Sequence, residues 1–409
     1  MTTFEDLYKR LLKNAVNSEK TSISGADEGH LDCLFHPEKH APVWQIKKCE
    51  CEGNGKCTAS CLFDAISRDE SGKITIDAAR CSGCSACIEA CNNGTLVQSR
   101  DVLPALYAVK EASGPVYALI APAFLGQFSD GVTPGKLRTA FRDLGFDGMI
   151  EVALFADVLT LKEALEFDRN VKTITDFQLA SCCCPIWIGM IRKMYSELIP
   201  HVPGAVSPMI AAGRAVKKMH PDAVTVFIGP CVAKKAEARE PDISGAVDFV
   251  LTFREMQDIF DAAGINPSEM KETERDHSSR AGRLYAKSGG VSEAVRETVK
   301  AMSPERNIAI KTKMAEGVPS CRAMIESLKN GSADANFFEG MGCIGGCVGG
   351  PKAVLDRQTG RVNVERYGDE AEYKTPLNNP YVLKMLNELG FETVEEFLEN
   401  SDIFIRKFD

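Results

Sequence analysis

Cysteine is the residue type with the most evident chemistry in this chain, which holds sixteen of them. Eight lie between Cys49 and Cys91, and the second half of that segment reads Cys81-x2-Cys84-x2-Cys87-x3-Cys91. In proteins with two [4Fe-4S] clusters, such a run wraps three thiolates around one cubane and sends the fourth to the other. The spacing therefore predicts a small electron-carrying module near the N-terminus.

The first half of that segment reads Cys49-x-Cys51-x5-Cys57-x3-Cys61, which keeps only the last spacing of the usual run. Structural zinc sites also use paired cysteines, but three cysteines within seven positions favour a cubane. We expect two [4Fe-4S] clusters, one held by Cys49, Cys51, Cys57 and Cys91, the other by Cys61, Cys81, Cys84 and Cys87.

Several of the remaining cysteines lie in three further motifs, far apart in the chain. These are Ala180-Ser181-Cys182-Cys183-Cys184-Pro185-Ile186-Trp187, Gly229-Pro230-Cys231-Val232-Ala233-Lys234-Lys235-Ala236-Glu237 and the glycine-rich run from Phe338 to Gly350. In order and approximate spacing they closely resemble the three H-cluster motifs of [FeFe]-hydrogenases. The resemblance covers about residues 45 to 352 and implies an enzyme that interconverts protons, electrons and H2.

The resemblance also implies an H-cluster, a [4Fe-4S] cubane joined to a two-iron subsite that carries CO, cyanide and an azadithiolate bridge. The glycines around the third motif allow close backbone approach to such a bulky group. Matched motif by motif, the cubane ligands are Cys184, Cys231, Cys343 and Cys347, with Cys347 as the bridge to the two irons, and the residues expected to line the pocket are Ala121, Pro122 and Met341.

Proton transfer needs titratable groups beside that cluster. Cys183 matches the family's proton-donating cysteine, and Glu163 and Glu166 match its relay carboxylates, three apart on one helical face. Lys234 is the candidate partner for a cyanide nitrogen, and Glu237 is expected to orient it. Outside these motifs, such residues would be read as a solvated lysine and a solvated acidic helix face.

The chain departs from the family at four positions. Pro203 stands where a relay serine is expected and Asn170 where an arginine is expected, so the outer proton path needs other groups. Gly229 replaces a frequent methionine, so one pocket wall is either roomier or filled from elsewhere. Cys182 adds a third consecutive cysteine to the first motif, which resembles a subgroup of the family. We hypothesise that extra local flexibility there lets the Cys183 sulfur cap the open iron under oxidising conditions and shield it from O2. Unchanged oxygen sensitivity in Cys182→Ala would refute this.

β-rich runs such as Val116–Ala121 and Val224–Ile228 alternate with helical patterns after about residue 110. This predicts an α/β catalytic domain of two lobes, with mostly parallel sheets flanked by helices and the site at the carboxyl ends of the strands. We expect four parts: a helical extension (1–45), an α+β ferredoxin-like two-cluster domain (46–105), the H-cluster domain (106–360) and a C-terminal helical segment packing on it (361–409). Cys321 is expected to be a buried small hydrophobe. Cys33 lies near three histidines, so a metal site at this position stays an alternative.

The net charge of −9 and the pI near 5.4 argue against nucleic-acid binding. An acidic start without an apolar run, and no membrane-length apolar stretch, lead us to expect a soluble cytoplasmic protein with no membrane partner. Expected partners are H2, protons, ferredoxin or a similar carrier, and hydrogenase maturation proteins. Two alternatives stay open: a hydrogenase-like iron-sulfur assembly factor without the two-iron site, and an H2 sensor.

Overall fold

The computed structural model describes residues 3–19, 25–51, 55–180, 183–273, 277–399 and 401–408. Its first part is helical. α1 (Phe4–Asn17) starts after Thr3, whose side chain caps the helix by accepting from the Asp6 N–H, and it buries one apolar face. It packs against α5 (Val102–Glu111) and α11 (Phe253–Ala263). The remaining elements of this part are α2 (Glu28–Phe35) and η1 (Pro37–Lys39).

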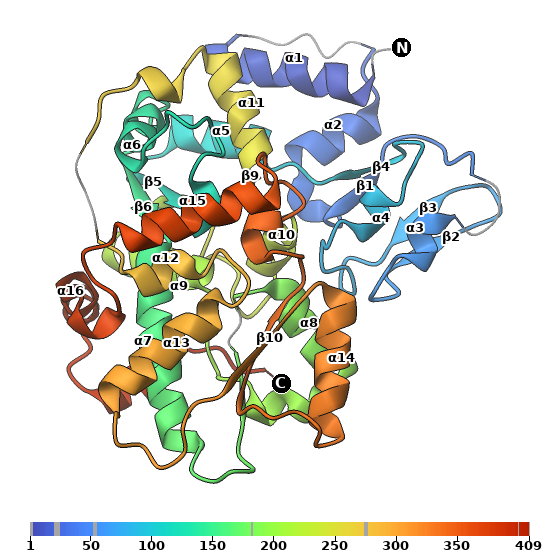
Figure 1. Cartoon of the computed structure of the whole chain (residues 1–409). Coiled ribbons are helices and arrows are strands. Elements are labelled where there is room, and N and C mark those ends of the chain that lie inside the picture. Colours follow the sequence, from blue (N-terminus) through green and yellow to red (C-terminus); the bar gives the residue numbers. More distant parts are fainter. Residues whose placement is uncertain are drawn as a thin grey trace.

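The cysteine-rich segment forms a lobe of short elements, seen at the right of Figure 1. It contains two antiparallel strand pairs, β1 (Val43–Gln45) with β4 (Leu96–Gln98), and β2 (Ile66–Arg68) with β3 (Ile74–Ile76). Two single-turn helices, α3 (Lys56–Ala59) and α4 (Ala86–Glu89), contact each other. This arrangement is compatible with the expected α+β module, whose ferredoxin-like nature stays a prediction.

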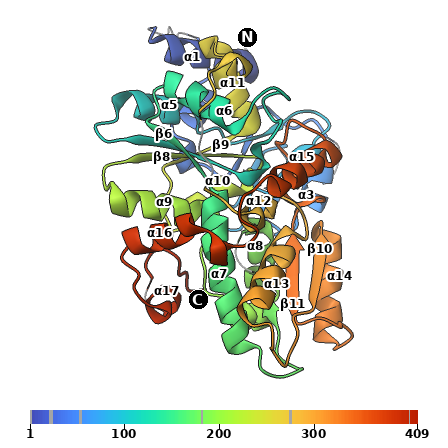
Figure 2. The ribbon, with the colours of Figure 1, turned by 60° about the vertical axis from the view of Figure 1, so that its left-hand side comes forward.

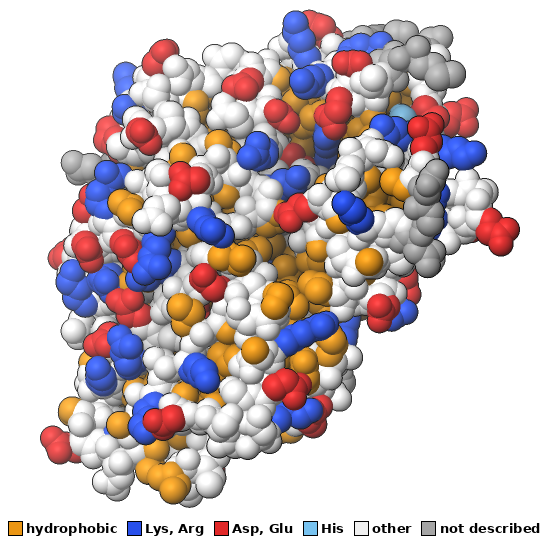
Figure 3. Space-filling model, turned by 45° about the vertical axis from the view of Figure 1, so that its right-hand side comes forward, with side chains coloured by type: hydrophobic (Ala, Val, Ile, Leu, Met, Phe, Trp, Pro, Cys, Tyr) orange, Lys and Arg blue, Asp and Glu red, His pale blue; other side chains and the backbone are white. Residues whose placement is uncertain are grey.

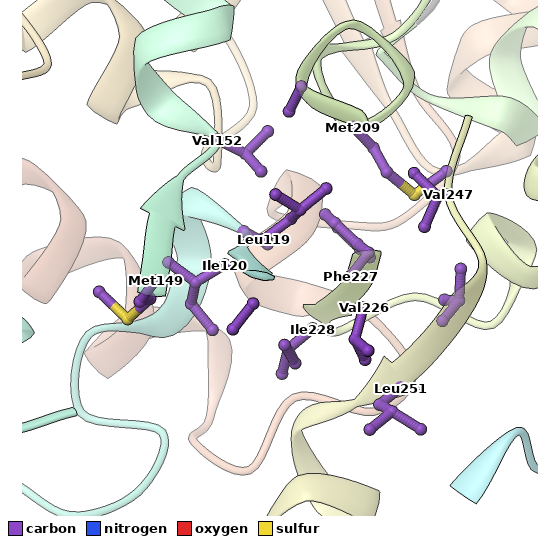
Figure 4. Close-up of a cluster of buried hydrophobic side chains, with 14 of the residues drawn as sticks. Leu119, Ile120, Met149, Val152, Met209, Val226, Phe227, Ile228, Val247 and Leu251 are labelled. Atoms are coloured by element: carbon purple, nitrogen blue, oxygen red, sulfur yellow. The ribbon is translucent and has the colours of Figure 1, made fainter. Parts of the chain in front are cut away.

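The upper lobe of the main body is built on a four-stranded parallel sheet of order β6-β5-β8-β9. Its strands are β5 (Val116–Ile120), β6 (Gly148–Glu151), β8 (Val224–Gly229) and β9 (Phe249–Thr252). Figure 2 shows α5, α6 (Pro134–Asp143) and α11 on one side of the sheet and α9 (Pro208–Met219) on the other. Apolar side chains from the strands and helices fill the space between these layers, with Leu119, Phe227 and Met209 close together in Figure 4.

The lower lobe holds a three-stranded parallel sheet of order β10-β11-β7. The strands are β7 (Gln178–Leu179), β10 (Thr312–Glu316) and β11 (Phe337–Met341), and the helices that pack on them are α8 (Pro185–Met194), α13 (Gly290–Met302) and α14 (Val318–Lys329). Two parallel sheets covered by helices confirm the expected α/β architecture of the catalytic domain.

A long helix, α7 (Ala153–Asn170), starts below the upper sheet and runs down into the lower lobe (Figures 1 and 2). It contacts α9, α13 and α12 (Arg280–Leu284). Helices near the C-terminus also pack on it, because α16 and α17 both contact α7. The other named elements are α10 (Ala233–Ala238), α15 (Arg357–Asp369), α16 (Pro380–Glu388), α17 (Val394–Glu399), η2 (Pro122–Phe124), η3 (Ser196–His201), η4 (Pro267–Glu269), η5 (Gly346–Gly349) and η6 (Pro376–Asn378).

The expected part boundaries cut across elements of the fold. The 45/46 boundary separates β1 from β4, its partner strand, 105/106 falls inside α5, and 360/361 falls inside α15. Hydrogen bonding and helix continuity thus join the parts more closely than composition suggested. Within the described residues, no helix has both the length and the apolar character to span a bilayer.

Candidate active site

The module cysteines lie in and around a small apolar cluster that includes Val43, Ile66, Ile74 and Leu96. Its two halves repeat one local design. The Ala65 N–H donates to the Cys61 sulfur at 3.2 Å, and the Thr95 N–H donates to the Cys91 sulfur at 3.3 Å. Both bonds follow a single-turn helix and a residue with positive φ, Asp64 or Gly94. Amide N–H groups aimed at sulfur stabilise thiolates that bind iron.

The structure brings Cys61 to the second cysteine run. Burial, together with the thiols of Cys81, Cys84 and Cys61, raises the pKa of Cys87 to about 12. Cys91 instead lies near the first run: a hydrogen bond with Cys49 raises the pKa of Cys51, and Cys91 adds to this effect. Both neighbourhoods follow the expected crossed pattern, while cluster ligation itself stays a prediction.

Among the described residues, no three His, Cys, Asp or Glu side chains approach closely enough to hold a single metal ion. A cubane takes one thiolate at each of its four irons, so its ligands need not approach so closely. Partly buried sulfurs that accept N–H donors, such as Cys61 and Cys91, fit such a group.

The cysteines of the three remote motifs meet between the two lobes. Burial, together with the nearby Cys184 thiol, raises the pKa of Cys231 to about 11 and that of Cys347 to about 12. Burial likewise raises the pKa of Cys343 well above its usual range, with Cys231, Cys184 and Cys347 adding to the effect. Four thiols from distant chain positions therefore share one desolvated region, which suits a bulky electron-rich inorganic group better than water.

Cys231 follows β8 at the carboxyl end of the upper sheet, where parallel sheets place their ligand sites. The adjacent end of β5 carries Ala121, whose N–H donates to the Ile228 carbonyl at 2.9 Å, and Pro122 begins η2 there. At Gly229, an added Cβ would lie 2.7 Å from the Phe227 ring. The space beside Gly229 is thus occupied by the Phe227 ring.

The third motif runs from β11, where Met341 is buried, into the turn η5. The Gly342 N–H donates to the Cys184 sulfur at 3.3 Å, which ties the first motif to the third. Gly346 has φ +78°, and a Cβ there would lie 2.6 Å from the Ser288 backbone nitrogen. Only glycine allows the backbone to pass so closely, so this turn is built as a cradle between its two cysteines.

Lys234 and Glu237 form a buried pair on α10, with their side-chain nitrogen and oxygen 2.6 Å apart. Burial lowers the pKa of Lys234, but the Glu237 carboxylate outweighs it and leaves the pKa above the usual value. The thiols of Cys231 and Cys183 also act on this ammonium. The structure therefore places Lys234 at the cysteine cluster and gives Glu237 the expected orienting contact.

Cys183 and Glu163 also reach this region. Burial raises the pKa of Cys183 well above its usual range, and Cys184, Cys347, Glu339 and Glu163 raise it further. Glu163 is fully buried on α7. Glu166 lies about one turn further toward the C-terminal end of the same helix, farther from the upper sheet. The thiol and both carboxyls thus follow one another from the cysteine cluster down α7.

Three polar residues near the site were missed from the sequence, although one of them, Glu339, lies inside the third motif. Glu339 on β11 is buried and accepts from the Gly289 and Ser292 N–H groups at 2.8 and 2.7 Å, at the start of α13. Tyr285 is buried, and its hydroxyl lies 2.9 Å from that of Thr160 on α7. Lys162 bonds to Glu166. Apart from the motif around Glu339, their only sequence signal is a polar residue inside an otherwise apolar pattern.

Other expectations have plain outcomes. Cys321 on α14 is 1% exposed, as expected of a small buried hydrophobe. Cys33 lies on α2, where His30 contacts the Ile46 carbonyl and His40 contacts Asp32 instead of the thiol. Asn170 is exposed at the end of α7, and Pro203 is buried. Cys182 lies outside the described residues, so the capping hypothesis stays a prediction.

The cysteine-rich module touches the catalytic part next to the site. A Cβ at Gly83 would lie 3.1 Å from both the Ala233 Cα and the Val232 carbonyl oxygen, so the second cysteine run abuts the loop after Cys231. Figure 3 shows hydrophobic side chains gathered in a hollow near the middle of one face. Ligand sites commonly have volumes of about 300 to 1,000 Å³. A cavity of about 550 Å³ here is lined by both Cys84 and Cys343.

A family model described as the iron-only hydrogenase large subunit, C-terminal domain, matches residues 114–351. That range is more than half of the chain and contains all three remote motifs. The chain belongs to the iron-only hydrogenase family. The cysteine-rich module, before residue 114, lies outside the matched range.

Relatives of two kinds resemble this iron-only hydrogenase family member. Iron hydrogenase 1 of Clostridium pasteurianum is 27% identical over 305 residues, which make up 64% of this chain and 53% of that protein. The chain thus spans about half the length of that relative. Protein NAR1 of Arabidopsis thaliana is 23% identical over 399 residues, 77% of this chain and 82% of that protein. A NAR1 homologue of Schizosaccharomyces japonicus, named a cytosolic Fe-S cluster assembly factor, is 23% identical over 253 residues, 53% of this chain and 49% of that protein.

Solved structures of the same family share the fold. A single-residue variant of [FeFe]-hydrogenase HydA1 from Chlamydomonas reinhardtii matches with a TM-score of 0.60 and 22% identity, over 73% of this chain and 97% of that one. A HydA structure concerned with stepwise H-cluster assembly matches with a TM-score of 0.61 and 21% identity, over 75% of this chain and 98% of that one. At this identity the likeness concerns the fold of the catalytic part.

Proposed function

We propose that this chain is an [FeFe]-hydrogenase that interconverts two protons and two electrons with H2 at an H-cluster. The observation that carries the proposal is the meeting of Cys184, Cys231, Cys343 and Cys347 in one desolvated region, with Cys183 beside them. Four thiols suit a cubane, and a fifth that is not needed as a ligand suits proton transfer.

The chain's residues would divide the work as follows. Cys184, Cys231, Cys343 and Cys347 would hold the H-cluster, which would supply the redox chemistry when bound, and Cys347 is the ligand that the family resemblance places at its two-iron part. Lys234, held by Glu237, offers an ammonium to the cyanide ligands. Ala121, Pro122 and Met341 exclude water around the two irons.

Protons would move along α7. The Cys183 thiol gives a proton to the site and takes its replacement from Glu163, which is reloaded through Glu166. The electrostatic influence of Glu163 on Cys183 supports this order. Burial of Glu163 keeps bulk water from bypassing the relay.

Electrons would arrive through the cysteine-rich module. We propose that it carries two [4Fe-4S] clusters and that the one held by Cys61, Cys81, Cys84 and Cys87 faces the H-cluster. The contact of Gly83 with the loop after Cys231 supports this, since electron transfer needs short gaps. A soluble carrier such as ferredoxin, in the cytoplasm, would supply the outer cluster, and hydrogenase maturation proteins would assemble the two-iron part.

The similarity to NAR1 proteins supports a second candidate function, that of an iron-sulfur assembly factor without the two-iron part. Such a protein needs the cubane thiols but has no use for a proton relay. Burying Lys234, Glu163 and Glu237 costs desolvation free energy, all three are under 10% exposed, and a role at the two-iron site would explain why this cost is kept. This weighs for the hydrogenase.

The test is H2 production by the full chain made together with maturation proteins, with a reduced dye as electron donor. The wild type is expected to evolve H2, and Cys183→Ala to lose at least about 100-fold in rate, because the last proton donor is gone. Cys33→Ala, which removes a half-buried thiol on α2, is the control and keeps the rate. Absent H2 from a wild type with intact [4Fe-4S] clusters would favour the assembly-factor reading.

A further inference from the structure

α7 carries a buried ion pair of which only one member, Glu166, has a role in the proposed proton relay. The ammonium of Lys162 donates a hydrogen bond to Oε1 of Glu166, one turn along the helix. We propose that Lys162 is a positioning residue of the proton relay, whose ammonium keeps Glu166 ionised and turned along α7 toward Glu163. This inference rests on the proposed function and adds to it a residue that no hydrogenase motif contains.

The burial of the pair sets it apart from ordinary helix ion pairs. The Lys162 side chain is 1% exposed and that of Glu166 is 15% exposed. Lys384 and Glu388 on α16 have the same order and spacing, but their side chains are 72% and 49% exposed. Exposed pairs contribute little to stability, and a buried ammonium is costly unless its partner stays charged. The buried pair is therefore poorly explained by stability alone.

Helix geometry places Glu166 between its two neighbours. At about 100° per residue, Glu166 lies about 40° around the helix from Lys162 and about 60° from Glu163. Its Oε1 is taken by Lys162, while its Oε2 is buried and has no hydrogen-bond partner among the described residues. Lys162 thus fixes one oxygen and leaves the other available to receive or release a proton.

The charges around Glu166 give Lys162 a specific role. Burial raises the pKa of Glu166, and Lys162 opposes this both by its charge and by its hydrogen bond. The other charged group that acts on Glu166 is Arg169, which is exposed on α7 and pairs with Glu399 of α17. Lys162 is accordingly the buried counter-charge of this carboxylate in the described part of the chain.

Two departures from the family pattern explain why Glu166 needs a counter-charge from within α7. The family resemblance expects a hydroxyl and a guanidinium in the outer relay, and the chain has Pro203 and Asn170 there. Neither side chain can supply a cation to Glu166. Lys162 does so from within α7, directly beside the inner relay residue Glu163.

The first test reads the Glu166 carboxyl directly, in the full chain produced without maturation proteins. Infrared difference spectra taken across a pH titration follow that group, with Glu166→Gln assigning its band. Lys162→Met is expected to raise the titration midpoint by at least about one pH unit, a tenfold change in proton affinity. Lys162→Arg should restore it, and Lys384→Met should leave it unchanged. Equal midpoints in Lys162→Met and wild type would overturn the proposal.

The second test uses the fully assembled enzyme. The acid limb of the pH profile of H2 turnover should move to higher pH in Lys162→Met and return in Lys162→Arg. If Lys162→Met does not fold, Lys162→Gln keeps a hydrogen-bond donor without the charge and is expected to show the same shift. If a folded Lys162→Met or Lys162→Gln variant keeps the pH profile of the wild type, the inference is overturned while the hydrogenase assignment stands. A wild type without turnover overturns the proposed function, while the carboxyl titration still reports on the pair.

Discussion

Asp157, near the start of α7, is a buried carboxyl that stability measurements can isolate. It accepts hydrogen bonds from the Ser279 N–H at 2.5 Å, the Gly282 N–H at 2.8 Å and the Asn379 side chain at 3.4 Å. Burial nevertheless raises the pKa of Asp157 to about 6. In the unfolded chain an aspartate titrates near pH 3.9. Between about pH 4 and pH 6 the folded state therefore binds the extra proton, and stability falls as pH rises through this window.

We predict that the free energy of unfolding of wild type, relative to that of Asp157→Asn, falls by about 2 kcal/mol from pH 4 to pH 6. The variant lacks the titrating proton, so effects common to both proteins, such as acid loss of clusters, cancel in the difference. Urea unfolding of both proteins at matched pH values measures it. A difference that stays constant or grows with pH would show that Asp157 is not held in its neutral form.

The residue scale also shows what sequence can and cannot give. Cysteine spacing and the flanking motifs led to Cys184, Cys231, Cys343 and Cys347, which the fold brings into one region. Lys162 and Tyr285 were not found, because lysine on a helix and tyrosine in a core are ordinary. Their position beside Glu166 and Thr160 depends on helix phase and tertiary packing, which no local pattern encodes.

At the scale of elements, the contact between the cysteine-rich module and the loop after Cys231 depends on Gly83. Its φ is +68°, and a Cβ would meet Ala233 and Val232 at 3.1 Å. Gly94 offers a matched control, since its φ is +57° and nothing lies within 4 Å of its Cβ position. An alanine at either position costs about 1 kcal/mol for the left-handed backbone.

We expect Gly83→Ala to lose clearly more stability than Gly94→Ala, because it also pushes the second cysteine run away from Cys231. The magnetic interaction between reduced clusters, measured by electron paramagnetic resonance, should weaken in Gly83→Ala and stay unchanged in Gly94→Ala. Identical behaviour of the two variants would mean that the module does not approach the site through this contact.

Strand prediction was good where the pattern was strong and poor where it was short. The runs at residues 116–121 and 224–228 became β5 and β8, and together with α7 they set the upper wall of the site. The part boundaries were not resolved by composition, because α5 and α15 run through them without a break. Local sequence signals mark where a helix or strand begins and ends. They do not mark that a helix such as α5 or α15 runs from one part of the fold into the next.

At the scale of the whole molecule, two lobes and a module meet at one place. The upper sheet brings Cys231, the lower sheet brings Cys343 and Cys347, and Cys184 comes from the segment between β7 and α8. α7 runs from this place into the lower lobe with its buried polar residues. In the proposed function, proton transfer along α7 and electron transfer through the module would therefore reach the site from different directions, which would keep the two routes separate.

Infrared spectroscopy of the full chain made with maturation proteins tests this account most directly. Metal-bound CO and cyanide absorb in a region of the infrared spectrum where few other groups do. The two-iron part can therefore be detected without an activity assay. We predict both sets of bands in the wild type and their loss in Cys347→Ser, which removes the thiolate bridging to that part. A wild type that binds its [4Fe-4S] clusters but shows neither set of bands would contradict the account.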